Sequence, residues 1–207
     1  MNVNFHFLLS AFFLLETFVF PTGLQSQTAV KVGEVAPAFE LMDISGKEIS
    51  MNSYADAKGF IIIFTCNHCP FSVLYEDRIN ALHEKYASMG WPVIAINPND
   101  PVQFPEDSFN AMKKRAKKKE FKFRYLFDES QETARAYGAE RTPHAFVVKN
   151  DAARTVEYIG AIDDNPKSAG EVQIPYLENA LNALDSGKAA DPNFTKAIGC
   201  SIKWKSN

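Results

Sequence analysis

Two apolar runs of strand length occupy the centre of the chain. Residues 60–65 and 91–97 lack the alternation of polar and apolar side chains that marks a half-solvated strand, so we predict strands buried on both faces. Between them, residues 71–89 repeat apolar side chains with the period of a helix, and Gly90 follows as the expected residue beyond its end. A strand, a helix and a strand of these lengths predict a right-handed βαβ unit with parallel strands.

Shorter patterned segments flank this unit. Two extended runs within residues 35–51, separated by Gly46, predict a β-hairpin. Further elements are expected in this order: a loop at 97–107, a helix at 108–120, an extended run at 121–128, a short helix at 129–137, a hairpin of strands 145–149 and 155–159, and a helix at 174–185. We find no repeat and no linker, and therefore expect one domain at residues 32–187 with a tail, 188–207, packed on it.

An apolar segment also opens the chain. Residues 5–20 are almost entirely apolar, but they are short for a membrane span of roughly 20 residues. Polar and small residues follow at 22–29, so we interpret residues 1–27 as a signal peptide. The alternative is an uncleaved membrane anchor. We expect a periplasmic or secreted protein without a stable membrane span after cleavage, and a membrane-anchored one if the segment is retained.

The composition is that of a globular protein. Of the 207 residues, 46% are hydrophobic and 23% are charged, which argues against disorder. The formal net charge of −3 gives no indication of binding to nucleic acid. We interpret the lysine-rich run at 113–119 as a solvated helix face rather than as a site for an acidic partner. Three cysteines are too few for a disulfide scaffold.

The candidate chemistry lies where the first buried strand gives way to the long helix. Residues 66–70 read Cys-Asn-His-Cys-Pro, with two cysteines separated by two residues at the start of a helix. Unpaired backbone N–H groups and the positive end of the helix dipole stabilise a thiolate there. We therefore expect Cys66 to be exposed and its pKa to lie below the usual value of roughly 8.5.

The order of elements, with Thr-Pro at 142–143 before a hairpin, resembles the thioredoxin fold. The leading hairpin and the insertion at 98–128 are similar to the redoxin branch, which includes the alkyl hydroperoxide reductase and thiol-specific antioxidant family. Residues 66–70 and the tail sequence Gly-Cys-Ser-Ile-Lys-Trp at 199–204 resemble a peroxiredoxin-like subgroup of it. The resemblance covers about residues 32–207. It implies an α/β protein with a thioredoxin-like fold, in which helices flank a central mixed β-sheet, with an N-terminal hairpin and a redoxin-type insertion.

The resemblance also implies a set of functional residues. Cys66 corresponds to the nucleophilic cysteine and Cys69 to the resolving one, while Pro143, preceded by Thr142, corresponds to a cis-proline that faces the cysteine pair. The implied activity is thiol–disulfide exchange through a redox-active disulfide, without a cofactor. The implied partners are protein or small-molecule thiols and disulfides, together with a redox partner protein.

These residues permit a two-step exchange. The Cys66 thiolate would attack a substrate disulfide, and Cys69, about one helical turn further on, would displace the reduced product. We hypothesise that an imidazolium at His68 stabilises the thiolate and makes the pair more oxidising, in which case His68→Ala should raise the pKa of Cys66. The alternative is that His68 is an exposed turn residue with no electrostatic role.

Two further residues have open assignments. We favour a small buried apolar side chain for Cys200, with a third thiol that pairs with Cys66 or a partner, or a metal ligand, as alternatives. His144 follows the Thr-Pro pair and is either a strand-start residue without a function or part of the site.

Three competing functions remain. A copper-delivery module would bind Cu(I) through Cys66, Cys69 and either His144 or Cys200, which are soft or imidazole ligands. A thiol peroxidase is disfavoured, because the Pro and Thr expected seven and three residues before the reactive cysteine are absent before Cys66 and before Cys69. A scaffold protein is the third alternative. The direction of electron flow is not encoded in any of these patterns.

Overall fold

The computed structural model describes residue 1 and residues 29–206. Apart from Met1, the predicted signal peptide at residues 1–27 lies outside the described residues. Within the described part of the chain, none of the helices has the length and apolar character needed to cross a membrane.

A mixed sheet of seven strands forms the centre of the molecule. Its strands follow the order β2-β1-β5-β4-β3-β7-β8. Their bounds are β1 Glu40–Asp43, β2 Glu48–Ser50, β3 Gly59–Phe64, β4 Val93–Asn97, β5 Arg124–Phe127, β7 His144–Lys149 and β8 Val156–Gly160. Strands β3, β4 and β5 are parallel, whereas β7 is antiparallel to β3 and β1 is antiparallel to β5.

The predicted βαβ unit is confirmed as β3, α1 (Pro70–Tyr86) and β4. All six residues of β3 and all five of β4 are buried, as the lack of alternation predicts. The parallel register pairs Ile61 with Val93 and Phe64 with Ile96. The carboxyl ends of the two strands therefore lie side by side, directly before α1 and before the loop that follows β4.

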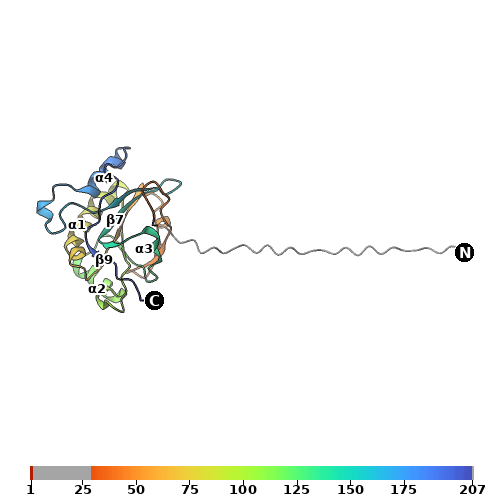
Figure 1. Ribbon diagram of the computed structural model, residues 1–207, viewed down its shortest axis with the longest axis horizontal. Coiled ribbons are helices and arrows are strands. Elements are labelled where there is room, and N and C mark those ends of the chain that lie inside the picture. Colours follow the sequence, from red (N-terminus) through yellow and green to blue (C-terminus); the bar gives the residue numbers. More distant parts are fainter. Residues whose placement is uncertain (2–28, 207) are drawn as a thin grey trace.

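Helices cover both faces of the sheet. Alternate residues of β3 point to opposite faces, so that Ile61 joins one apolar core and Ile62 the other. The first core contains side chains of α1, α2 (Phe109–Lys119) and α4 (Tyr176–Asp185), and the second contains α3 (Glu132–Tyr137). Figure 1 shows α3 on the side of the molecule away from α1. Within residues 29–206 there are also four short 3-10 helices: Met51–Ser53, Ala87–Met89, Pro105–Asp107 and Ala169–Glu171.

The carboxyl-terminal tail returns to the centre of the molecule. Strand β9 (Cys200–Ser201) pairs with β6 (Arg141–Thr142) in a separate two-stranded sheet, in the register that sets Cys200 opposite Thr142. Figure 1 shows the β9 label between α1 and α3, close to β7. Because Ile202 is buried in the second core, the tail packs against the same sheet whose strand β3 leads into residues 66–69.

Candidate active site

The two cysteines of residues 66–69 lie in the turn between β3 and α1. Cys69 is the residue immediately before the helix, and Pro70 takes its first position, where no backbone N–H is needed. The carbonyl oxygen of Cys69 accepts a hydrogen bond from the N–H of Val73 at 3.0 Å. The placement of the pair between the buried strand and the helix is as predicted.

Cys69 forms a disulfide with Cys200, and Cys66 is a free thiol. The Cα atoms of Cys69 and Cys200 lie 6.1 Å apart. The favoured assignment of Cys200 as a small apolar side chain is therefore wrong. The physical reason is the pairing of β9 with β6, which brings a cysteine 131 residues distant in sequence to the start of α1.

The surroundings of Cys66 correct two expectations. Its side chain is buried, at 3% exposure, rather than exposed. Burial raises the pKa of the Cys66 thiol, and the nearby Asp107 carboxylate raises it further, while hydrogen bonds with Thr142, the Cys69 backbone and Ser72 oppose the rise. The expected lowering of this pKa is therefore wrong, because the loss of solvent outweighs the hydrogen bonds that favour the thiolate.

Thr142 contacts both sulfur atoms of the pair. Its Oγ1 lies 3.3 Å from Cys66 Sγ, within hydrogen-bond distance, and its carbonyl oxygen lies 3.3 Å from Cys69 Sγ. The Thr142–Pro143 peptide bond is cis, as the resemblance implied. Thr142 is fully buried and pairs with Cys200 in the small sheet, so all three cysteines lie around one residue.

His68 faces an acidic side chain that the sequence analysis did not identify. Its Nδ1 atom contacts Asp107 Oδ2, and its ring stacks on Phe104 with 4.5 Å between the ring centroids. Asp107 is fully buried in the 3-10 helix Pro105–Asp107. The carboxylate therefore orients the imidazole, so His68 is not the freely exposed turn residue of the alternative reading.

The same carboxylate holds the turn that carries the cysteines. Asp107 Oδ1 accepts a hydrogen bond from the N–H of Asn67 at 2.6 Å, and Oδ2 accepts one from Asn99 Nδ2 at 2.9 Å. Asn67 also donates from Nδ2 to the carbonyl oxygen of Glu106 at 2.7 Å and accepts from Tyr125 Oη at 3.0 Å. A buried polar network of this kind fixes the geometry of the turn.

One signal in the sequence points to this network. Asn97 ends the buried strand β4 and Asn99 follows it, at the sheet edge where ligands of open α/β sheets bind. Asn97 Nδ2 donates to the carbonyl oxygen of Asp107 at 3.2 Å. Asp107 itself stands in a proline-containing loop, and no residue pattern distinguishes it from the other acidic loop residues.

Two of the ligands considered for copper, Cys69 and Cys200, are bonded to each other, so neither offers a free thiolate. His144 lies in β7, where its Nδ1 accepts the N–H of Glu140 at 3.4 Å and burial lowers its pKa to about 4. Among the residues that the structure describes, the ligand-type side chains that do meet are those of Cys66, His68 and Asp107, whose ligand atoms lie within 4.8 Å of one another.

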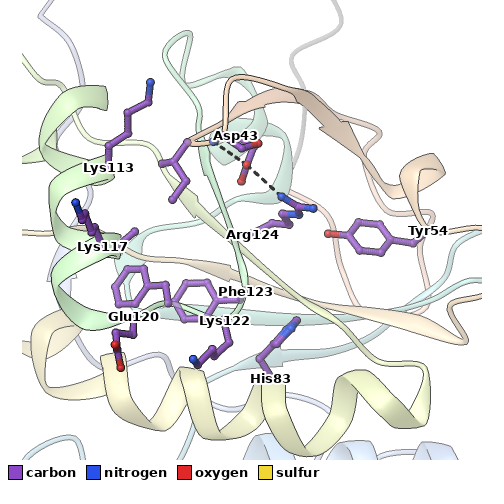
Figure 2. A pocket seen from close by; sticks show the side chains of 13 residues that line it. Asp43, Tyr54, His83, Lys113, Lys117, Glu120, Lys122, Phe123 and Arg124 are labelled. Carbon is purple, nitrogen blue, oxygen red and sulfur yellow. Dashed lines mark hydrogen bonds and ion pairs between the residues drawn. The ribbon is translucent and has the colours of Figure 1, made fainter.

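A hollow lies at the opposite end of the sheet. It has a volume of about 840 Å³, and Figure 2 shows Lys113 and Lys117 at the left of the view and Arg124 paired with Asp43. Arg124 begins β5, so the hollow lies at the amino ends of the parallel strands, whereas the cysteines follow the carboxyl end of β3. This hollow is therefore separate from the cysteines.

A second cavity borders the tail. Its volume is about 440 Å³, and its lining includes Arg141 and His144, which flank Thr142 and Pro143, as well as Phe194 of the tail. Phe194 is 63% exposed, a high value for so large an apolar side chain. The cavity thus adjoins the strand that carries Thr142.

Comparisons with known proteins identify the family of the chain. Residues 32–159 match the AhpC/TSA family. The thiol-disulfide oxidoreductase ResA of Geobacillus thermodenitrificans (strain NG80-2) is 27% identical over 139 residues, which are 67% of this chain and 75% of that protein. A hypothetical protein from Sinorhizobium meliloti 1021 has a crystal structure that matches with a TM-score of 0.80 and 32% identity, over 87% of this chain and 98% of that chain.

The thioredoxin domain of a thiol-disulfide oxidoreductase from Bacteroides vulgatus shares the fold, with a TM-score of 0.51 and 17% identity over 62% of this chain and 86% of that chain. The predicted thioredoxin-like α/β fold is confirmed. The relatives support the predicted class, thioredoxin-like thiol–disulfide oxidoreductases. Because this family match covers more than half of its length, the chain belongs to the AhpC/TSA family.

Proposed function

We propose that the chain is an exported thiol–disulfide oxidoreductase in which Cys66 and Cys69 form the reacting pair. The observation that carries the proposal is the Cys69–Cys200 disulfide beside the free thiol of Cys66, with both Cys66 and Cys69 sulfurs 3.3 Å from atoms of Thr142. A thiol and a disulfide held together are the reactants of thiol–disulfide exchange. The similarity to ResA, which is a thiol-disulfide oxidoreductase, supports the same activity.

The proposed nucleophile is the Cys66 thiolate. Because burial and the Asp107 carboxylate raise the pKa of the thiol, only a small fraction is ionised at neutral pH. The hydroxyl group of Thr142, 3.3 Å away, donates a hydrogen bond to the sulfur once the proton has left. Thr142 and Pro143 thus form one wall of the site, against which a substrate sulfur would approach Cys66.

His68 is the proposed acceptor of the thiol proton. A nitrogen atom of its ring lies within 4.8 Å of Cys66 Sγ, and Asp107 contacts Nδ1. A carboxylate at Nδ1 holds the proton on that nitrogen and leaves Nε2 as the basic one. Asp107 is therefore a positioning residue that acts through His68.

The proposed substrates are protein or small-molecule disulfides and thiols, with a partner protein that restores the redox state of the pair. Export rests on the apolar amino-terminal segment and has a chemical consequence, because a dithiol outside the cytoplasm meets oxidising conditions. No cofactor is required for exchange between sulfur atoms.

A kinetic assay tests the proposal. Purified protein should accelerate the reduction of insulin disulfides by dithiothreitol, and Cys69→Ala should bring the rate to the uncatalysed level. Asp107→Asn should lower kcat and flatten its pH dependence while leaving KM similar, since the carboxylate orients His68 and does not touch substrate. Wild-type protein that gives no acceleration over the uncatalysed rate would refute the activity.

A further inference from the structure

We propose that Cys200 is a third redox-active cysteine, which exchanges with external thiols and passes the disulfide inward to Cys66 and Cys69. The inference rests on the proposed function and extends it, because the pair at residues 66–69 then works through the tail. The three cysteines form one relay, in which Cys69 is the shared partner of the other two.

The exposure of the three cysteine residues sets the order of the relay. Cys66 is 3% exposed and Cys69 is 0% exposed, whereas Cys200 is only half-buried. The rate of thiol–disulfide exchange depends on which sulfur an attacking thiolate can reach. In the Cys69–Cys200 disulfide, that sulfur belongs to Cys200.

Contacts other than the disulfide hold the tail against the domain. Ile202 is buried, and its N–H donates to the carbonyl oxygen of Glu140 at 3.1 Å. Lys203 donates from its N–H to Asn99 Oδ1 at 2.9 Å, and its carbonyl oxygen accepts from Asp100 N–H at 2.9 Å. These contacts are independent of the disulfide, so a reduced Cys200 remains beside Cys69.

The chain before Cys200 is also fitted to the site. A Cβ atom at Gly199 would lie 2.2 Å from the carbonyl oxygen of Thr142. Only glycine therefore lets the tail pass this close to Thr142, the residue that contacts both Cys66 and Cys69. The approach of the tail and the arrangement of the sulfurs are parts of one site.

The inward transfer conserves electrons. The Cys66 thiolate attacks Cys69 Sγ, the Cys66–Cys69 bond forms and the Cys69–Cys200 bond breaks. The electron pair leaves on the Cys200 sulfur, which takes up one proton in exchange for the one lost by Cys66. Both states contain one disulfide and one thiol, so the step needs neither an oxidant nor a reductant.

The outward transfer uses an external dithiol as the reductant. One of its thiolates attacks Cys200 Sγ, and the Cys69 thiolate leaves. The second thiolate of the donor then attacks the donor sulfur of the mixed disulfide and releases Cys200. Two electrons and two protons pass from the donor to the protein, which ends with three thiols, and the reverse sequence oxidises the protein.

The test is the reaction of the oxidised full chain with reduced glutathione, stopped with acid and mapped by peptide mass spectrometry. In the wild type, glutathione should appear first on Cys200, and the disulfides present before its addition should include both Cys69–Cys200 and Cys66–Cys69. Cys200→Ser, oxidised to the Cys66–Cys69 disulfide, should react at least tenfold more slowly, because both sulfurs are buried. Ser201→Ala, an exposed neighbour in the same strand, is the matched control and should react like the wild type.

Three outcomes would overturn the relay: glutathione found first on Cys66 or Cys69, Cys200→Ser reacting within twofold of the wild type, or no Cys66–Cys69 disulfide in the wild type. If Cys200→Ser fails to fold, the peptide mapping of the wild type alone decides whether the relay stands. A Cys200→Ser protein that still catalyses insulin reduction at the wild-type rate refutes the role of Cys200 and leaves the proposed function standing. An oxidised wild type that is inert to glutathione and inactive on insulin refutes both.

Discussion

Reduction of the Cys69–Cys200 disulfide should lower the free energy of unfolding substantially. The bond closes a loop over 131 residues, for which the chain-entropy account gives about 5 kcal/mol as an upper value. Native disulfides commonly contribute about 2–4 kcal/mol. Since the contacts of Ile202 and Lys203 hold the tail without the disulfide, the loss comes mainly from greater freedom of the unfolded chain. We therefore expect a decrease of about 3–5 kcal/mol.

The assay is urea unfolding followed by circular dichroism, with and without a phosphine reductant. The slope against urea should also rise on reduction, because an unfolded chain without the cross-link exposes more surface. Cys200→Ser should show the lower stability in both conditions, whereas Ser201→Ala should respond to the reductant as the wild type does. A wild type whose unfolding free energy changes by less than about 1 kcal/mol on reduction would contradict the cross-link's role as a constraint on the unfolded chain.

Three further predictions concern titration. Asp107→Asn should lower the pKa of Cys66 by removing a nearby negative charge. The pKa is measured from the ultraviolet absorbance of the thiolate, and a higher pKa in the variant would mean that the orientation of His68 dominates. Thr142→Val should raise that pKa, since it removes a hydrogen bond that stabilises the charged sulfur; an unchanged titration would exclude the contact. Burial holds the pKa of His144 at about 4, below its usual 6.5, so stability should be full above pH 6.5 and fall by about 3 kcal/mol as pH decreases through 4. His144→Gln should remove this part of the loss of stability in acid, measured as the unfolding free energy in urea at several pH values. An equal loss of stability in the variant would rule out the contribution of His144.

The periodicity of apolar residues was sufficient to predict the scaffold. Residues 60–65 and 91–97 became the buried strands β3 and β4, and the helix between them begins at Pro70, one residue before its predicted start. The reason is that a strand buried on both faces of a sheet needs apolar side chains at every position, which produces an unbroken apolar run. The placement of the cysteine motif followed directly, because its position between strand and helix is a local property.

The pairing of the cysteines could not be predicted in the same way. Cys69 and Cys200 are 131 residues apart, and their contact depends on how the tail returns to β6. The protonation of Cys66 was mispredicted for a related reason. Its pKa reflects burial by distant segments and the charge of Asp107 in a later loop, neither of which is visible in residues 66–70.

The measurement that tests the central claim most directly is the reduction potential of the purified protein in glutathione buffers, with thiols trapped and counted by mass. We expect one two-electron transition between about −270 and −120 mV, the range of known exchange proteins. One thiol should remain on the oxidised side of the transition and three on the reduced side, since the chain has three cysteines. Three free thiols throughout that range, or a disulfide that does not respond to it, would contradict a function in thiol–disulfide exchange.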